Sequence, residues 1–326
     1  MPPDFGLPSA TPATLYSRFP TNWEPSSFLL LPIIMAPKRK ISRRADVYVH
    51  GYSEREDRRL RDQSQTLAEL LHRDSLYPAG SRVLEVGCGV GAQTVLLARH
   101  SPRAQFTSVD LSPLSVQAAK AAVRRAGFKN VAFQTADLFK LPFAPASFDH
   151  VFVCFVLEHL PEPARALRCL RAVLKPGGTL TVIEGDHGST LFHPRSDAAC
   201  RTIQCLIDLQ AEAGGDALIG RRLFPLLRTA GFREVTVSPR FVYVDASRPA
   251  WVEGFTRNTY IAMVEGVRQR ALAAGLIDRR AWEKGIGDLK ASAGAGGTFC
   301  YTFFKAVAVK SRPKWSANRR RPPGGA

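Results

Sequence analysis

The sequence predicts an α/β fold in which a doubly wound, largely parallel sheet carries helices on both faces. The first observation is the stretch VLEVGCGVGAQT at residues 83–94, which is typical of a buried strand, a glycine-rich turn and the start of a helix. The second is the alternation of strand and helix patterns up to residue 184. The third is the recurrence of acidic side chains where strands end. In such sheets a ligand lies beyond the carboxyl ends of the strands, so we expect one site there.

The core elements follow one another in a regular order. Strands are predicted at 82–86, 105–110, 131–135, 149–154 and 179–184, and helices are predicted to end at residue 100 and to span 113–127 and 162–174. Ahead of them, Ser53 and Glu56 have the spacing of a capping box, and leucines continue at helical spacing to about residue 73. Because this helix precedes the core, we expect it to form a lid over the ligand. Tyr52 lies just before its start, where we expect it either to reach the active site or only to staple the helix down.

The pattern changes after residue 184. A first inserted segment is expected at about 186–220 with a helix at 198–212, and it is followed by a helix at 221–229 and a strand at 234–244. A second, helical insertion is expected at about 248–297, and a long final strand at 298–310. We expect the two insertions to form a cap over the substrate. A single folded domain would then occupy residues 46–310, between end segments at 1–45 and 311–326 that are basic and predicted to be disordered.

The ligand of the glycine-rich turn is expected to be a nucleotide. Glycine permits a sharp turn and a close approach of the backbone to a ligand, and the helix that follows directs its first N–H groups at that ligand. The spacing Gly87-x-Gly89-x-x-Ala92 also satisfies a dinucleotide pattern, so that the glycines alone leave NAD open. Asp110 ends the second strand, where an acid accepts both ribose hydroxyls. Asp137 follows the third strand, where an acid beside an apolar residue suits an adenine.

The ordered series LEVGCGVG, SVDLS, TADL, FDHVFVCFVLEHL and LKPGGTLTVIE resembles the class I S-adenosylmethionine-dependent methyltransferases, in particular their small-molecule and natural-product branch. The resemblance covers about residues 47–310. It implies a Rossmann-like sheet of seven strands with an antiparallel final strand, and S-adenosylmethionine as cofactor. By the same resemblance the cofactor contacts fall on eight positions: Gly87, Gly89, Gly91, Asp110, Leu111, Asp137, Leu138 and Phe155. A domain of this fold that binds no methyl donor, and a cofactor-binding subunit without catalysis, remain the alternatives.

Candidate catalytic groups cluster after the fifth strand, in the segment EGDHGS at residues 184–189. His187 is the first candidate for a general base, because an unperturbed imidazole titrates near neutral pH. Tyr52 is the second catalytic candidate, as an orienting group or proton relay, since related small-molecule enzymes carry similar segments. The alternative for His187 is a structural role, in which its side chain only forms a hydrogen bond with a loop. His159 follows the fourth strand, where it is expected to lie near the cofactor.

Composition limits the partners. The net charge is +17, but residues 1–45 hold six basic and two acidic side chains and residues 310–326 hold six basic and none acidic, so 10 of these charges lie in the end segments. This distribution argues against nucleic acid as the main partner, although a nucleic-acid-associated protein that uses basic tails is the alternative function. Removal of both tails would separate the two functions, because a small-molecule enzyme should keep its activity and a tail-dependent binder should lose its partner.

No apolar run has the roughly 18–20 residues of a membrane span, and FLLLPIIM at residues 28–35 does not make a convincing signal peptide. Met35 is considered as the native start.

The six cysteines show neither a CxxC pair nor a zinc-ligand spacing, which favours a reduced, cytoplasmic protein without a metal. The motifs of base-amine and cytosine-C5 methyltransferases are also absent: the fourth strand is followed by CFVLEH, and no cysteine follows Pro or Thr. Both absences argue against a nucleobase as acceptor, but they leave methylation of ribose or protein open. The resemblance to the small-molecule branch implies a small, hydrophobic metabolite methylated on carbon, nitrogen or oxygen. Aromatic side chains of the predicted cap suit it, or belong to the core: Trp251, Phe255, Tyr260, Trp282, Phe299 and Tyr301. A homo-oligomer that exchanges its lid helix is left open.

Overall fold

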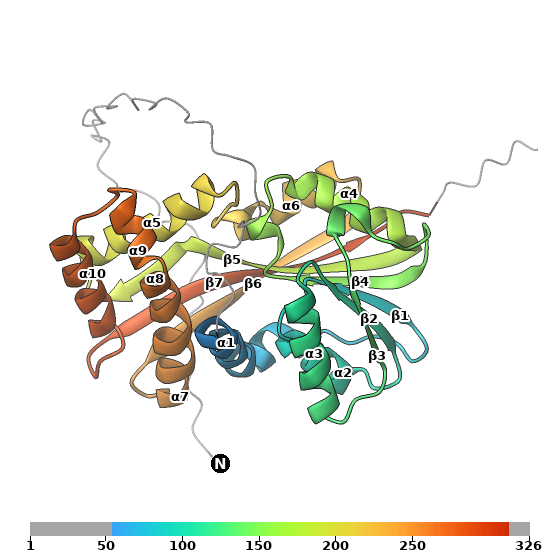
Figure 1. The fold of residues 1–326 in the computed structure, drawn as a ribbon, viewed down its shortest axis with the longest axis horizontal. Helices are drawn as coiled ribbons and strands as arrows, with labels where there is room; N and C mark the ends of the chain where they lie inside the picture. The colour runs from blue at the N-terminus through green and yellow to red at the C-terminus, as the bar shows by residue number, and fades with distance from the viewer. Residues whose placement is uncertain (1–53, 313–326) are drawn as a thin grey trace, which may run out of the picture. The chain divides into compact units, whose positions relative to one another are not determined.

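The computed structural model describes residues 54–312, which form a seven-stranded sheet in the order β3-β2-β1-β4-β5-β7-β6 (Figure 1). The strands are β1 (Arg82–Val86), β2 (Gln105–Asp110), β3 (Val131–Thr135), β4 (Phe148–Cys154), β5 (Leu174–His193), β6 (Arg233–Asp245) and β7 (Thr298–Val309). The strands β1 to β5 are parallel to one another, and β7 runs antiparallel to both of its neighbours, β5 and β6. The predicted fold class, including the antiparallel final strand, is confirmed.

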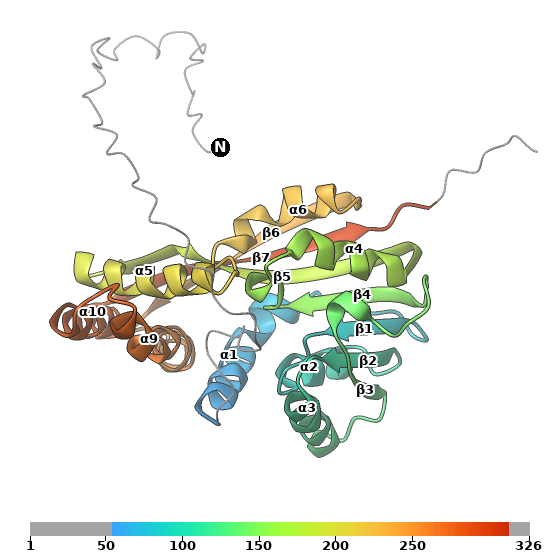
Figure 2. The same ribbon diagram turned by 45° about the horizontal axis from the view of Figure 1, so that its top comes forward.

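Helices cover both faces of the sheet (Figure 2). They are α1 (Glu54–His72), α2 (Ala92–His100), α3 (Pro113–Arg125), α4 (Pro163–Val173), α5 (Asp197–Glu212), α6 (Leu223–Thr229), α7 (Pro249–Trp251), α8 (Ala262–Gly266), α9 (Arg268–Ala273) and α10 (Arg279–Ala291), with short turns η1 (Leu138–Lys140), η2 (Leu157–His159) and η3 (Ile219–Arg222) and a π-helix η4 (Val252–Ile261). Neighbouring side chains of β1 point to opposite faces of the sheet. Val83 is buried with side chains of α1 and α2, and Leu84 is buried with side chains of α4 and α6. This is why β1 is buried along nearly its whole length, from Val83 to Val86.

The strand β5 is longer than expected. The sequence predicts its end at Glu184, but the strand continues to His193, so the first eight residues of the expected insertion at 186–220 are strand. Gly185 and Gly188 favour a turn in a sequence pattern, yet here they lie in a strand that stays paired with β7 beyond an irregular stretch. The insertion contains one helix of more than a turn, α5. Together with β6 and β7, the extended β5 continues beyond the other strands and carries α5 and α10 (Figure 1).

The second insertion is mostly helical, as predicted, and contains the π-helix η4. In η4 the Thr259 hydroxyl donates to the Gly254 carbonyl at 2.7 Å, five residues earlier. Gly254 lies against α1: a Cβ at this glycine would stand 2.1 Å from Oγ1 of Thr66. The lid helix α1 and the cap therefore meet through a position that has room only for glycine.

The C-terminal end of α1 is fastened to the sheet by a buried amino group. Lys305 of β7 lies 2.6 Å from the Asp74 carboxylate, just after the helix, and donates to Oγ of Ser75 at 2.8 Å. Asp74 also pairs with Arg240 of β6. These contacts hold the lid helix at a fixed place against the sheet.

Several predictions fall on residues outside the described part of the chain. Tyr52 and the end segment at 1–45 lie outside it, and so does nearly all of the segment at 311–326, whose predicted disorder stays a prediction. Among residues 54–312, no helix is both long and apolar enough to cross a membrane.

Candidate active site

The glycine-rich turn between β1 and α2 contains three glycines with left-handed backbone angles, and each has its own reason. Gly87 has φ 77° and faces Val156, whose Cγ2 would lie 2.3 Å from a Cβ. Gly91 has φ 79° and packs on α3, where the Cα of Ala119 would lie 2.7 Å from a Cβ. Gly89 has φ 50° and no atom within 4 Å of its missing Cβ, so its backbone faces open space. A ligand can approach this backbone without meeting a side chain.

Replacement of Gly91 by alanine is expected to destabilise the protein more than replacement of Gly80, which has a similar φ of 77° but open space around its missing Cβ. Both variants incur roughly 1–2 kcal/mol for an alanine with left-handed angles. Gly91→Ala should lose about 1–3 kcal/mol more, because α3 must move away. Urea denaturation of both variants measures the difference, and equal losses would show that α3 does not press on this turn.

Asp110 ends β2 beside this turn. Its carboxylate accepts hydrogen bonds from the backbone N–H groups of Gly89 and Ser112, both at 2.9 Å. Burial raises the pKa of Asp110, and these backbone hydrogen bonds act to lower it. The carboxylate is thus held in place at the strand end, with Leu111 as its neighbour at the edge of the cavity.

Two further strand ends contribute to the same place. Asp137 follows β3 and caps the turn η1, accepting from the N–H of Phe139 at 2.8 Å, and the neighbouring Leu138 is buried. Phe155 follows β4 with φ 57°, an angle uncommon for a residue with a Cβ. Its ring lies 5.4 Å from that of Phe303.

A cavity of about 520 Å³ connects these strand ends with the cap. Seven of the eight predicted cofactor positions line it; Gly91 does not, because it lies behind the turn against α3. The lid helix contributes Arg59, Leu60 and Gln63, as expected for a helix that covers the site. The far end is mostly aromatic or apolar and is lined by Phe255, Tyr260, Met263, Tyr301 and Phe303.

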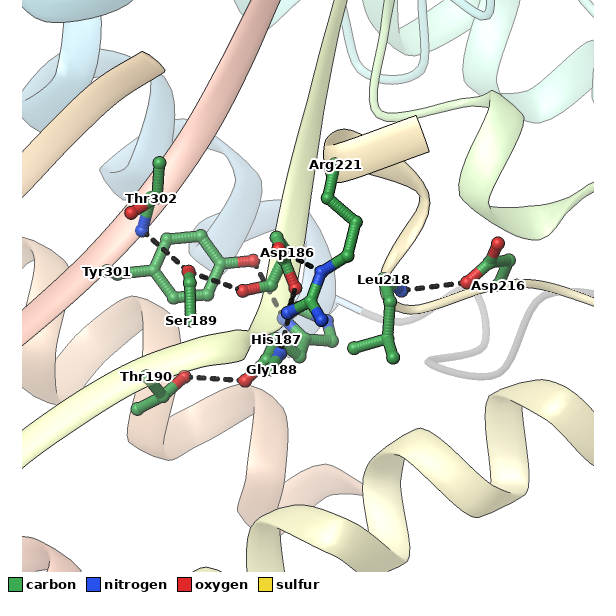
Figure 3. A network of polar contacts seen from close by, with 10 residues as sticks. All are labelled: Asp186, His187, Gly188, Ser189, Thr190, Asp216, Leu218, Arg221, Tyr301 and Thr302. Atoms are coloured by element: carbon green, nitrogen blue, oxygen red, sulfur yellow. Dashed lines mark hydrogen bonds and ion pairs between the residues drawn. The ribbon is translucent and has the colours of Figure 1, made fainter. Parts of the chain in front are cut away.

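His187 reaches the cavity from an irregular stretch of β5 (Figure 3). Pairing with β7 is regular up to Asp186 and Thr302 and resumes at Leu191 and Cys300, so β5 advances by five residues while β7 advances by two. Bulges of this kind bend a strand and redirect its side chains. The bulge is what turns His187 toward the cavity.

The bulge is held by polar groups of its own. The carboxylate of Asp186, with its side chain 3% exposed, forms a two-point ion pair with Arg221, at 2.6 Å and 2.7 Å. One of its oxygens also accepts from the N–H of Gly188 at 3.0 Å. Ser189 donates to the Asp186 carbonyl at 2.7 Å and accepts from the N–H of Thr302 at 2.9 Å, which ties the bulge back to β7 (Figure 3). Asp186 therefore has a structural role and is not available as a base.

The imidazole of His187 is buried among aromatic side chains. Its Nδ1 lies 2.8 Å from the hydroxyl of Tyr301, and the hydroxyl of Tyr260 is taken by Thr190 at 2.6 Å. Burial lowers the pKa of His187 below its ordinary value, so the ring is neutral near pH 7. Burial also raises the pKa of Tyr301 well above its ordinary value, so the phenol keeps its proton.

Four charged or titratable side chains act on His187 from around the cavity. Glu158 and Asp186 raise its pKa, while His159 and Arg59 lower it, all less strongly than burial does. Glu158 and His159 come from η2, and they line the cavity as expected for His159. Arg59 comes from the lid helix and is 7% exposed. No pattern in the sequence singles out Arg59 or Glu158, since each looks like an ordinary charged residue of a helix or turn.

Two buried acids near the site have structural roles. Glu184, the first acid of the EGDHGS segment, accepts from the N–H groups of Val156 and Leu157 at 3.1 Å and 2.8 Å, and burial raises its pKa well above the ordinary value. Glu85 accepts from the hydroxyl of Ser108 at 2.6 Å, and burial raises its pKa to about 7. Neither lines the cavity. Glu184 holds the turn after β4, which does line it, and Glu85 ties β1 to β2.

The cavity fits S-adenosylmethionine at its nucleotide end. The open backbone face at Gly89 admits a ligand, and the fixed carboxylate of Asp110 stands where a ribose would need an acceptor. Leu111 and Leu138 supply apolar walls on the same side, beside Asp137. The residues present therefore suit an adenosine whose other end points toward His187.

Comparisons with known proteins agree with this geometry. A family model described as a methyltransferase domain matches residues 84–182. The chain is 32% identical to an O-methyltransferase, cnsE, of Penicillium expansum, over 59% of this chain and 67% of that protein. It is 28% identical to the 27-O-demethylrifamycin SV methyltransferase of Amycolatopsis mediterranei, over 68% of this chain and 76% of that protein.

A third relative is an uncharacterised 37.1 kDa protein in transposon TN4556 of Streptomyces fradiae, 32% identical over 65% of this chain. Of that protein's own length 58% is covered, and two other curated relatives are covered over 35% and 45% of theirs. The part matched by the family model includes the glycine-rich turn and the ends of β2, β3 and β4 that line the cavity. The chain belongs to the S-adenosylmethionine-dependent methyltransferases.

Proposed function

We propose that this protein transfers a methyl group from S-adenosylmethionine to a small, hydrophobic metabolite. The observation that carries the proposal is the single cavity that joins the glycine-rich turn and Asp110 to His187 and the aromatic cap. A donor at one end and an acceptor at the other would then meet inside one mostly apolar cavity. Bound ligands that fill such a cavity would keep water away from the reacting atoms.

The neutral imidazole of His187 favours a hydroxyl group as the site of methylation. When bound, S-adenosylmethionine supplies a methyl group on a positively charged sulfur, so the acceptor needs only to be held in line and, if it is a hydroxyl, to lose its proton. His187 accepts that proton at the ring nitrogen that faces the cavity. One relative is named as an O-methyltransferase and another as a methyltransferase of 27-O-demethylrifamycin SV, and both names support oxygen over nitrogen or carbon as the acceptor atom.

The proposed cofactor residues each have one task. Asp110 accepts from the ribose hydroxyls, Asp137 from the adenine amino group, and the backbone at Gly89 lies against the nucleoside. Leu111, Leu138 and Phe155 form the apolar walls. The free thiols of all six cysteines support the cytoplasm as the place of action.

Calorimetric titration of S-adenosylmethionine into the full-length protein is expected to show one binding site, and a parallel titration with NAD none. Incubation with S-adenosylmethionine and a panel of phenols, hydroxylated macrolides and amines, read by mass spectrometry, should add 14 Da (roughly the mass of CH₂) to a hydroxylated member. Binding of NAD in place of S-adenosylmethionine would overturn the proposal. The alternative, nucleic-acid association through basic tails, rests on end segments that lie almost wholly outside the described residues.

A further inference from the structure

The two ring nitrogens of His187 have different surroundings. Nδ1 lies 2.8 Å from the hydroxyl of Tyr301, which belongs to β7, the strand next to β5. The imidazole also lines the cavity. Since Tyr301 occupies Nδ1, Nε2 is the nitrogen left to meet a ligand.

The hydroxyl of Tyr301 is confined to this place by its surroundings. Its ring is 1% exposed and packs between Phe303 and Tyr260, with ring centroids at 4.7 Å and 5.5 Å. The hydroxyl passes over Gly185 of β5, where a Cβ would stand only 2.3 Å from its oxygen. Any other residue at position 185 would push the hydroxyl away from His187.

Tyr260 does not compete for the imidazole. Its hydroxyl is paired with Thr190 at 2.6 Å, and its ring meets His187 edge-on at 6.1 Å. Thr190 in turn donates to the carbonyl of His187 at 2.9 Å. The bulge and the two tyrosines therefore hold both the backbone and one side of the ring of His187.

We propose that Tyr301 is a positioning residue for His187. The Tyr301 hydroxyl oxygen accepts a hydrogen bond from Nδ1–H of the imidazole, and this directs a bare Nε2 of His187 at the hydroxyl group of the substrate. The inference rests on the proposed function. For Nε2 to take a proton, the neutral ring must already carry its own proton on Nδ1, and the Tyr301 oxygen is the acceptor placed to hold that tautomer.

The proton balance follows from this arrangement. The acceptor's O–H bond breaks and its proton moves to Nε2, while the oxygen's electron pair forms the new O–CH₃ bond and the electron pair of the broken S–CH₃ bond stays on sulfur. The resulting imidazolium keeps its Nδ1–H on Tyr301 and later releases the Nε2 proton to water. Tyr301 is not itself the base, because its raised pKa keeps the phenol protonated.

Nitrogen-15 NMR of histidine-labelled protein tests the proposal without any acceptor, because a protonated and a bare ring nitrogen have well-separated shifts. The His187 signals are assigned by their loss in His187→Gln. We expect the wild type to carry its proton on Nδ1, and Tyr301→Phe to show a mixture of both tautomers. A proton on Nε2 in the wild type, or an unchanged tautomer in Tyr301→Phe, would overturn the assignment.

Tyr77→Phe is the matched control, since it removes another buried tyrosine hydroxyl that does not line the cavity. It should leave the His187 signals unchanged. Thermal unfolding reports whether Tyr301→Phe folds. If this variant does not fold, the tautomer of the wild type still tests the proposal, because a proton on Nε2 would contradict it. With an acceptor in hand, Tyr301→Phe should lower kcat by roughly 10- to 100-fold at nearly constant KM, as when other groups that orient an imidazole are removed.

Calorimetry with S-adenosylmethionine on the same proteins separates this inference from the proposed function. Tyr301→Phe should bind the cofactor as the wild type does. If the wild type does not bind it, the proposed function fails whatever the tautomer. If it binds but the NMR outcome is negative, only the role of Tyr301 is wrong. Because Glu158, Asp186, His159 and Arg59 also act on His187, all spectra are compared at one pH.

Discussion

Asp110→Ala is expected to weaken S-adenosylmethionine binding by roughly 100-fold or more. A hydrogen bond to a charged group contributes about 1.5–3 kcal/mol, and in our proposal this carboxylate accepts from both ribose hydroxyls. The substitution also frees the N–H groups of Gly89 and Ser112, which the carboxylate holds at 2.9 Å, so the turn itself loses its anchor. Both effects act in the same direction. Calorimetric titration of wild type and variant measures the loss.

Asp149→Ala is the matched control. Asp149 also holds a strand end, since it accepts from the N–H of Arg82 at 2.9 Å and from Lys175 at 2.7 Å, but it stands at the opposite edge of the sheet and does not line the cavity. It should lose stability while keeping its cofactor affinity within about 2-fold, since it removes no group in the cavity. If Asp110→Ala bound as the wild type does, or if both variants lost affinity equally, Asp110 would not be a ribose ligand.

The first five strands and their connecting helices could be predicted because their signals are local. The apolar run of β1 and the glycines after it lie within a dozen residues, and each reflects a requirement of the backbone at that position. At Gly87 and Gly91 the structure shows that requirement as a close neighbour, Val156 in one case and Ala119 in the other. The same local logic placed Asp110 and Asp137 at the edge of the cavity.

The contact between His187 and Tyr301 could not be predicted, because it depends on the register of β5 against β7, 114 residues apart. That register includes a bulge in and around the segment GDHGS at residues 185–189, whose two glycines and aspartate are typical of a turn. The sequence therefore predicts that β5 ends at Glu184, whereas the strand continues to His193. The hydroxyl chemistry of Tyr301 was hidden for the same reason, since an aromatic residue in an apolar strand looks like core until its partner is known.

His187→Gln is expected to lower kcat by about 10²–10⁴-fold, the usual contribution of a positioned general base, while leaving S-adenosylmethionine binding nearly unchanged. Glutamine retains a polar group within reach of Tyr301 but takes no proton near neutral pH. The measurement is the rate of methyl transfer to the acceptor that the screen identifies. An acceptor that is already anionic, or is a neutral amine, needs no general base. An unchanged kcat in His187→Gln would therefore show that His187 is not the general base of this reaction.

The matched control is His150→Gln, which removes a half-buried imidazole that bonds Thr179 at 2.8 Å and lies outside the cavity. It should keep the wild-type rate.

The dependence of kcat on pH gives a second, independent test of His187 as the base. Because burial lowers the pKa of His187, its neutral form persists below the pH at which an ordinary imidazole takes up a proton. The wild-type kcat should therefore stay constant from alkaline pH down through 6.5, the ordinary imidazole value, and fall only at lower pH. A fall that begins above that value would mean that a different group, with a higher pKa, must be deprotonated for the reaction.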